Sequence, residues 1–191
     1  MLNKVIDISD WQDGIDLQQV KNEGIYGVIV KLGQNMRETK CGRDFIFKAL
    51  EVGLKVGVYY YSTATNYDEA KAEGQWVNAK LHEIGLTDWH LQLGCWYDYE
   101  ESSVINTKTM DENTWMCTAF INEIKDLHTV GVYGGYCAFW DQTTLLSKCP
   151  WIPIWCAQYN KTCDYPNPKL WQFTDSFDCA GMQVDCSYLY Y

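Results

Sequence analysis

The segment CWYDYEES, residues 95–102, is an apolar, aromatic run that ends in two carboxylates. Asp98 and Glu100 lie two residues apart, and on a β-strand such side chains point to the same face. Two neighbouring carboxyls repel each other when ionised, so the pKa of at least one should rise. A protonated carboxyl beside an ionised one is what cleavage of a glycosidic bond requires. An ordinary strand end, where charged residues mark the start of solvent, explains this pair equally well.

The elements around this pair decide what it can do. Apolar runs alternate with helical patterns along the 191 residues. Strands are predicted over residues 4–9, 26–33, 55–63, 93–100, 130–135, 152–159, 170–174 and 183–189. Helices are predicted over residues 16–24, 43–53, 68–85 and 110–127. Strands that alternate with helices indicate parallel pairing, and eight of them indicate a closed barrel.

The late connections differ from those of a regular barrel. Residues 160–169 and 175–182 are too few for a helical crossover, which needs a dozen or more. The last three strands should therefore lack covering helices, and the final pair should be antiparallel. We predict an α/β fold, an irregular TIM-like barrel of eight strands and about five helices, which forms one domain over residues 1–191.

Four acids fall where such a barrel carries its chemistry. Reactive groups collect at the carboxyl ends of barrel strands. Asp7 lies near the end of the first predicted strand, Asp98 and Glu100 end the fourth, and Asp185 lies early in an antiparallel eighth. All four would then face one mouth of the barrel. The alternative is that Asp7 caps a local turn and that Asp185 is a lone charge on the rim.

Composition excludes several classes of function. The net charge is −10 and Lys and Arg do not cluster, so nucleic acid is not an expected partner. No apolar run approaches 18 residues, so we expect no membrane insertion. With 3 His and no C-x-x-C pair we expect no metal site, and no cofactor. The 9 Trp and 14 Tyr exceed what a core needs, and aromatic rings together with acids suit sugars.

The first residues, MLNKVIDISDWQ, show no apolar h-region and no small-residue cleavage site. Either the protein is made in the cytoplasm without a signal peptide, or a leader has been removed. The 9 Cys would remain reduced structural thiols in a cytoplasmic protein.

Five short motifs, in order from residue 6 to residue 189, resemble those of glycoside hydrolase family 25, the Chalaropsis-type lysozymes. They are IDISDWQ, YDYE, PIWCAQY, LWQFT and VDCSYL. The barrel of this family has five helices and three late strands without them, which agrees with the connection lengths. Two positions depart from its pattern: Ile6 stands where a Gly is usual, and Gln34 lies near the place of a missing acid.

The resemblance implies a muramidase, which cuts the β-1,4 bond between N-acetylmuramic acid and N-acetylglucosamine in peptidoglycan. Glu100 would be the general acid and Asp98 its partner, with Asp7 and Asp185 completing a ring of carboxylates. The implied substrate-binding residues are Tyr59, Tyr133, Trp155, Gln172 and Lys31. Strand alternation allows Tyr59 to face the barrel interior, whereas we expect Trp11 and Trp171 to be packing residues.

The implied partner is the glycan strand of bacterial peptidoglycan. The expected role is that of a phage or prophage endolysin, or an autolysin, which reaches the wall after release or export. A wall-binding module missing from this chain would fit that role.

The sequence leaves two alternative functions to weigh. A chitinase-like barrel would carry acids at 93 and 96, where this chain has Leu93 and Trp96. A noncatalytic wall-binding barrel would have lost its acid, but Glu100 is present.

Carboxyls two residues apart on a strand lie roughly 6–7 Å apart. That spacing falls between those of retaining and inverting pairs. The 2-acetamido group of the substrate, as an internal nucleophile, favours retention.

Overall fold

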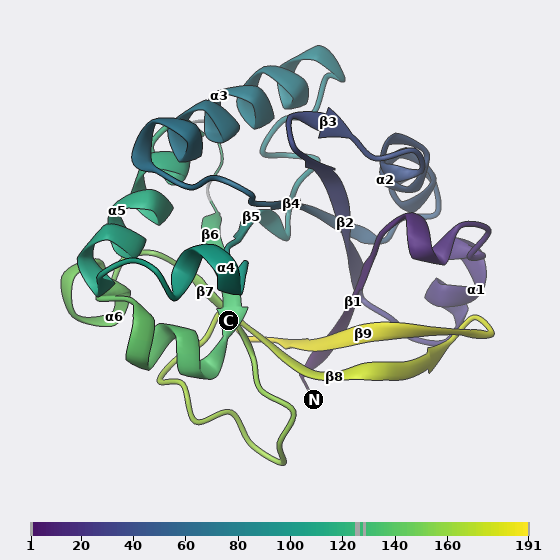
Figure 1. The fold of residues 1–191 in the computed structure, drawn as a ribbon. Coiled ribbons are helices and arrows are strands. Elements are labelled where there is room, and N and C mark those ends of the chain that lie inside the picture. The colour runs from purple at the N-terminus through teal and green to yellow at the C-terminus, as the bar shows by residue number, and fades with distance from the viewer. Residues whose placement is uncertain (1, 125–126, 128, 191) are drawn as a thin grey trace.

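The structure, a computed structural model, describes residues 2–124, 127 and 129–190 (Figure 1). Eight strands close into a barrel: β1 (Asn3–Ile8), β2 (Gly27–Gln34), β4 (Lys55–Tyr61), β5 (Gly94–Asp98), β6 (Val130–Gly135), β7 (Ile154–Ala157), β8 (Leu170–Cys179) and β9 (Met182–Leu189). A ninth, two-residue strand, β3 (Arg37–Glu38), pairs only with β2, as a hairpin. The predicted eight-stranded α/β barrel is confirmed.

Strand directions follow from the connections. From β1 through β2, β4, β5, β6 and β7 to β8, neighbouring strands are parallel. The last strand, β9, is antiparallel to both β8 and β1 and closes the barrel between them. A turn at Ala180 and Gly181, both with positive φ, joins β8 to β9, and the pair extends away from the barrel as a ribbon (Figure 1).

Six α-helices are described: α1 (Leu17–Asn22), α2 (Gly42–Glu51), α3 (Tyr67–Glu83), α4 (Ser102–Ile105), α5 (Met110–Ile121) and α6 (Leu145–Lys148). A 3-10 turn, η1 (Asp10–Gln12), follows β1, and a π-helical turn, η2 (Ala138–Gln142), follows β6. The helix predicted over 110–127 ends at Ile121, and its residues 125 and 126 lie outside the described residues. No helix occurs in residues 158–190, which confirms the prediction for the late strands.

Helix starts obey ordinary capping rules. Asp16 accepts backbone N–H bonds at the start of α1, and Asn66 does so at α3. Thr109 and Glu112 form a capping box at α5, in which each side chain accepts the other's backbone N–H. None of the helices described here has the length and apolar character to cross a membrane.

The wall of the barrel separates two apolar layers. Inside the barrel lies a cluster of seven buried side chains: Val5, Ile29, Leu93, Trp96, Trp155, Leu170 and Leu189. The larger outer layer lies between the strands and the helices, so parallel strands are buried on both faces and read as continuous apolar runs. Tyr60 packs outward against Trp76 of α3 and Phe120 of α5, whereas Tyr59 packs inward, as predicted.

Candidate active site

A cavity of about 210 Å³ opens at the carboxyl ends of the parallel strands. It is lined by Asp7, Ser9, Trp11, Lys31, Tyr59, Tyr61, Asp98, Glu100, Tyr133, Trp155 and Asp185. The structure thus brings the four predicted acids to one cavity, together with four of the five predicted binding residues. Gln172 is the exception.

Asp7 and Asp185 face each other across neighbouring strands. They are register partners on β1 and β9, and their carboxyls hydrogen-bond to each other. Burial raises the pKa of Asp7 well above its usual range, and the negative charge of Asp185 raises it further. Burial, followed by the charge of Asp175, raises the pKa of Asp185 to about 6. Asp7 reaches the cavity surface, but protein atoms surround its carboxyl more closely than that of Asp185, so burial raises the pKa of Asp7 further.

Gln172 of β8 binds this pair instead of facing the cavity. Its Nε2 donates to Oδ2 of Asp7 at 3.1 Å and to Oδ2 of Asp185 at 3.2 Å. Its Oε1 accepts from the hydroxyls of Tyr133 at 2.9 Å and Tyr159 at 3.0 Å. The side chain is 1% exposed, and these four hydrogen bonds occupy both its donor and its acceptor positions. Gln172 was expected to contact substrate; its place in the fold makes it a support for the two carboxylates.

Asp98 is the most unusual group of the site. It ends β5, is 5% exposed, and its Oδ1 is the one buried side-chain polar atom without a hydrogen-bond partner in the described part of the chain. Burial raises its pKa well above the usual range, Glu100 adds to the rise, and Lys31 opposes it. Buried polar atoms without partners are rare, and here the atom belongs to a residue that lines a cavity.

Glu100 lies just beyond β5 at the mouth. Its side chain is exposed, yet enough protein surrounds the carboxyl that partial burial raises its pKa; the charge of Asp185 adds to the rise, and Lys31 opposes it. Tyr99, between the two acids, turns to the other side, where its hydroxyl donates to Oδ1 of Asn113 at 2.8 Å. The alternation predicted for this segment is therefore present.

Aromatic rings form the floor of the cavity. Trp155 is 2% exposed, and its indole N–H donates to the hydroxyl of Ser187 at 2.9 Å. Tyr133 and Tyr59 pack edge-on against Trp155, with ring centroids 4.6 and 6.4 Å away. This indole hydrogen bond fixes the orientation of the floor.

Trp11 lines the same cavity from η1, and the prediction that it is a packing residue is wrong. It is 92% exposed. Ser9 and Gln12 form a capping box that holds the turn on which Trp11 stands. An indole fixed in solvent beside a row of acids is a surface against which a sugar ring can lie. Trp171, in contrast, packs against Phe173 and Tyr188 as predicted.

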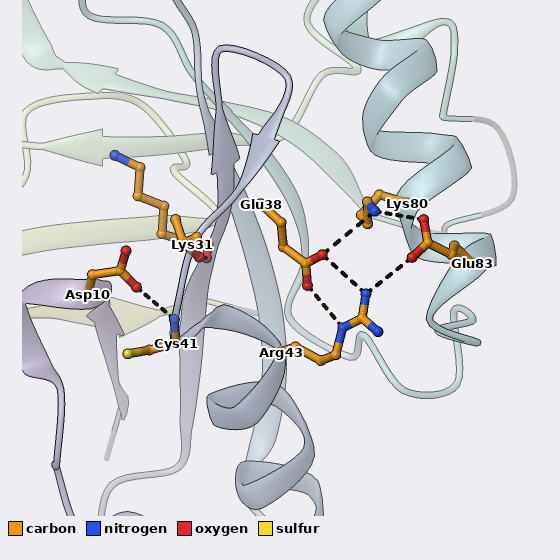
Figure 2. Close-up of polar contacts among 8 residues, drawn as sticks. Asp10, Lys31, Glu38, Cys41, Arg43, Lys80 and Glu83 are labelled. Carbon is orange, nitrogen blue, oxygen red and sulfur yellow. Dashed lines mark hydrogen bonds and ion pairs between the residues drawn. The ribbon is translucent and has the colours of Figure 1, made fainter.

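Lys31 of β2 is half-buried on the cavity wall. Its Nζ donates to Oε1 of Gln34 at 2.9 Å and lies 4.8 Å from the ring centroid of Tyr61. Burial lowers its pKa, while Asp98 is the largest of the acids that oppose this change. Figure 2 shows its ammonium group directed away from Glu38 of the neighbouring hairpin. Gln34 stands near the expected place of an acid, and no carboxylate among the described residues forms an ion pair with Lys31.

Two cavity residues, Ser9 and Tyr61, did not follow from sequence. Tyr159 does not line the cavity, but its hydroxyl donates to Gln172. The signal for Tyr61 was available, because it shares a strand face with Tyr59. Among the described residues, no group of three or more His, Cys, Asp or Glu is arranged to hold a metal ion.

An eight-stranded barrel with carboxylates and aromatic rings at the carboxyl ends of its strands carries the groups that glycoside hydrolysis requires. The chain belongs to glycosyl hydrolases family 25, whose sequence profile matches residues 6–182. A search of curated protein sequences gave no match.

Solved structures agree with this membership. The modular autolysin LytC from Streptococcus pneumoniae is similar with a TM-score of 0.83 and 27% identity, over 98% of this chain and 46% of LytC. The chain thus spans about half of that relative. The catalytic domain of an endolysin from a Listeria monocytogenes bacteriophage is similar with a TM-score of 0.72 and 22% identity, over 100% of this chain and 94% of that one. A muramidase from Trichobolus zukalii is similar with a TM-score of 0.80 and 16% identity, over 98% and 93%.

Proposed function

We propose that the protein is a muramidase that cleaves the β-1,4 bond between N-acetylmuramic acid and N-acetylglucosamine in bacterial peptidoglycan. Family membership and the carboxylate cavity support this activity. The observation that carries the proposal is the unpaired Oδ1 of Asp98 in that cavity. A 2-acetamido sugar brings an N–H donor of the kind that this buried acceptor lacks.

In this mechanism Glu100 is the acid. Its raised pKa keeps a proton available for the leaving oxygen, and its exposed position at the mouth lets it reach the glycosidic bond. Asp98 accepts the acetamide N–H, which directs the acetamide oxygen toward the anomeric carbon. Bond breakage and attack by that oxygen form a cyclic oxazolinium ion. Water then attacks the anomeric carbon while Glu100, now ionised, takes a proton from it. This step opens the ring with net retention.

The remaining groups support these two. Asp185, held beside Asp7 by Gln172, has a pKa of about 6 and is ionised above that pH, so its negative charge stabilises the positive charge that develops on the sugar. Tyr59, Tyr133 and Trp155 form a rigid apolar floor below the ring. Lys31, on the wall of the cavity, binds the substrate.

The test is digestion of purified peptidoglycan by the parent protein and by Glu100→Gln. We expect the parent to create N-acetylmuramic acid reducing ends, seen as muramitol after borohydride reduction, and Glu100→Gln to be slower by roughly 10²–10⁴-fold. Glu51→Gln makes the same chemical change on the exposed end of α2 and serves as the matched control. Glucosaminitol in place of muramitol, or an active Glu100→Gln, would contradict the proposal.

We further propose that the barrel acts on the wall as an endolysin or autolysin, after release or export from the cytoplasm in which it is made. LytC is an autolysin and the Listeria phage protein is an endolysin, and the similarity to both supports this role. A separate wall-binding module stays a prediction, which the modular character of LytC supports. Binding of Glu100→Gln protein to intact walls, measured by co-sedimentation, tests how much affinity the barrel supplies alone.

A further inference from the structure

A second and larger cavity, of about 580 Å³, adjoins the carboxylate cavity. The two share Ser9, Trp11 and Lys31 on their linings. The β2–β3 hairpin, residues 27–38, forms the far wall of the second cavity, and Arg37 and Lys40 line it. A ligand that crosses the exposed indole of Trp11 would therefore occupy both.

The two cavities differ in charge. The first holds four carboxylates, whereas the second is lined by Lys31, Arg37 and Lys40, with Asp10 and Glu38 as its acids. This concentration of cations is notable in a chain of net charge −10.

Both acids of the second cavity are already occupied (Figure 2). Asp10 accepts the backbone N–H of Cys41 at 2.8 Å and of Lys40 at 3.2 Å. Glu38 pairs with Arg43 at 3.0 Å and with Lys80 at 3.6 Å, and Glu83 joins the same network. Both carboxylates keep their charge, but Asp10 is bound to the segment before α2, and Glu38 is bound to side chains of α2 and α3.

Of the three cations that line the second cavity, Arg37 is the one whose side chain has no partner among the described residues. Lys40 pairs with Asp13 at 2.8 Å, and Lys31 is bound to Gln34. Within residues 2–124, 127 and 129–190, Arg37 forms no ion pair, and its side chain is exposed on the cavity wall. A guanidinium with its donors free is suited to a carboxylate, which it binds through two parallel hydrogen bonds.

The hairpin that carries Arg37 is held in place before any ligand arrives. Its turn residues, Asn35 and Met36, both have positive φ (51° and 53°), as a tight two-residue hairpin requires. The Met36 N–H donates to the hydroxyl of Tyr60 at 3.0 Å, and the Thr63 hydroxyl donates to Oδ1 of Asn35 at 2.6 Å. Together with the Glu38 network, these bonds fix the hairpin at its turn and at β3, so little entropy is lost on binding.

We propose that Arg37 binds a carboxylate of the peptide stem that the muramic acid residue carries, while the sugar ring lies in the carboxylate cavity. This inference rests on the muramidase activity proposed above. The lactyl group of that sugar bears an acidic peptide, so the substrate is neutral at the ring and anionic beside it. The paired cavities present the complementary order of charge: carboxylates at the ring and a free guanidinium beside it.

The experiment compares two soluble substrates: glycan strands with their peptide stems intact, and the same strands after an amidase has removed the peptides and the lactyl carboxylates so exposed have been coupled to methylamine as neutral amides. The measured quantity is the ratio of kcat/KM on the first substrate to that on the second. We expect Arg37→Gln to lower this ratio about fivefold to tenfold, since a partly exposed charged hydrogen bond is weaker than a buried one. Arg37→Lys should retain part of the ratio, and added salt should reduce it in the parent.

Lys48→Gln is the matched control, because it removes one positive charge from an exposed position on α2, outside both cavities. Its ratio should equal that of the parent. An Arg37→Gln ratio equal to the parent's would overturn the proposal, as would equal losses on both substrates, which would assign the guanidinium to the glycan or to the fold. If the parent cleaves neither substrate, the muramidase proposal itself fails, so the two failures are distinguishable.

Discussion

Asp185→Asn should stabilise the protein above neutral pH. Burial and the charge of Asp175 raise the pKa of Asp185 from 3.8 to about 6, so the folded state binds this proton more tightly than the unfolded state does. The parent therefore loses stability as pH rises from about 4 to 6, where the native group must ionise. At 1.36 kcal/mol per pKa unit, the largest possible cost is about 3 kcal/mol. Because Asp185 remains partly open to solvent, we expect about 1–2 kcal/mol.

The assay is urea denaturation of parent and Asp185→Asn protein at pH 4 and pH 8. The variant should gain about 1–2 kcal/mol in free energy of unfolding at pH 8 and almost nothing at pH 4. The amide that replaces the carboxyl retains an oxygen that can accept from Gln172 in place of Oδ2. Asp141→Asn, at an exposed position on η2, is the control and should change stability by less than about 0.5 kcal/mol. An equal gain at both pH values, or none at pH 8, would refute the electrostatic reasoning.

Three further outcomes follow from the site. Trp11→Ala should raise KM on soluble strands about threefold to tenfold, from about 0.5–1.5 kcal/mol of ring contact, without moving the melting temperature; a lower melting temperature would make the indole a packing residue after all. Tyr60→Phe removes the acceptor of the Met36 N–H and should lower the free energy of unfolding in urea by about 1 kcal/mol. It should also weaken the preference for peptide-bearing strands. No change in either quantity would mean that other contacts hold the hairpin. Proton NMR of the first-formed product should show the β-anomer, and an initial α-anomer would exclude the acetamido route through Asp98.

The barrel followed from sequence because its strands are long apolar runs with helical segments between them. The positions of the four acids could be predicted because closure of a barrel places the carboxyl ends of its parallel strands around one mouth. The segment after β6 did not follow: η2 and α6 are single turns, too short for a helical period to be read. The two-residue strand β3 is too short to predict in the same way.

Side-chain partners were harder to predict than strand positions. Trp11 was expected to pack because large apolar residues usually do, but the capping box of η1 holds it in solvent. The hydrogen bonds from Tyr133 and Tyr159 to Oε1 of Gln172 could not be predicted, because these tyrosines lie on other segments of the chain. Such contacts depend on three-dimensional closure, which a local pattern does not encode.

The closing position of β9 has a consequence for synthesis on the ribosome. Asp7 is translated well before Asp185, yet they are register partners. Until β9 emerges, β1 and β8 both present open edges, which are templates for aggregation. The nascent chain therefore cannot assemble its carboxylate pair early, and any cleavage of the wall must wait for a fully translated barrel. Premature stop codons upstream of β9 should yield insoluble, inactive chains instead of weakened enzymes.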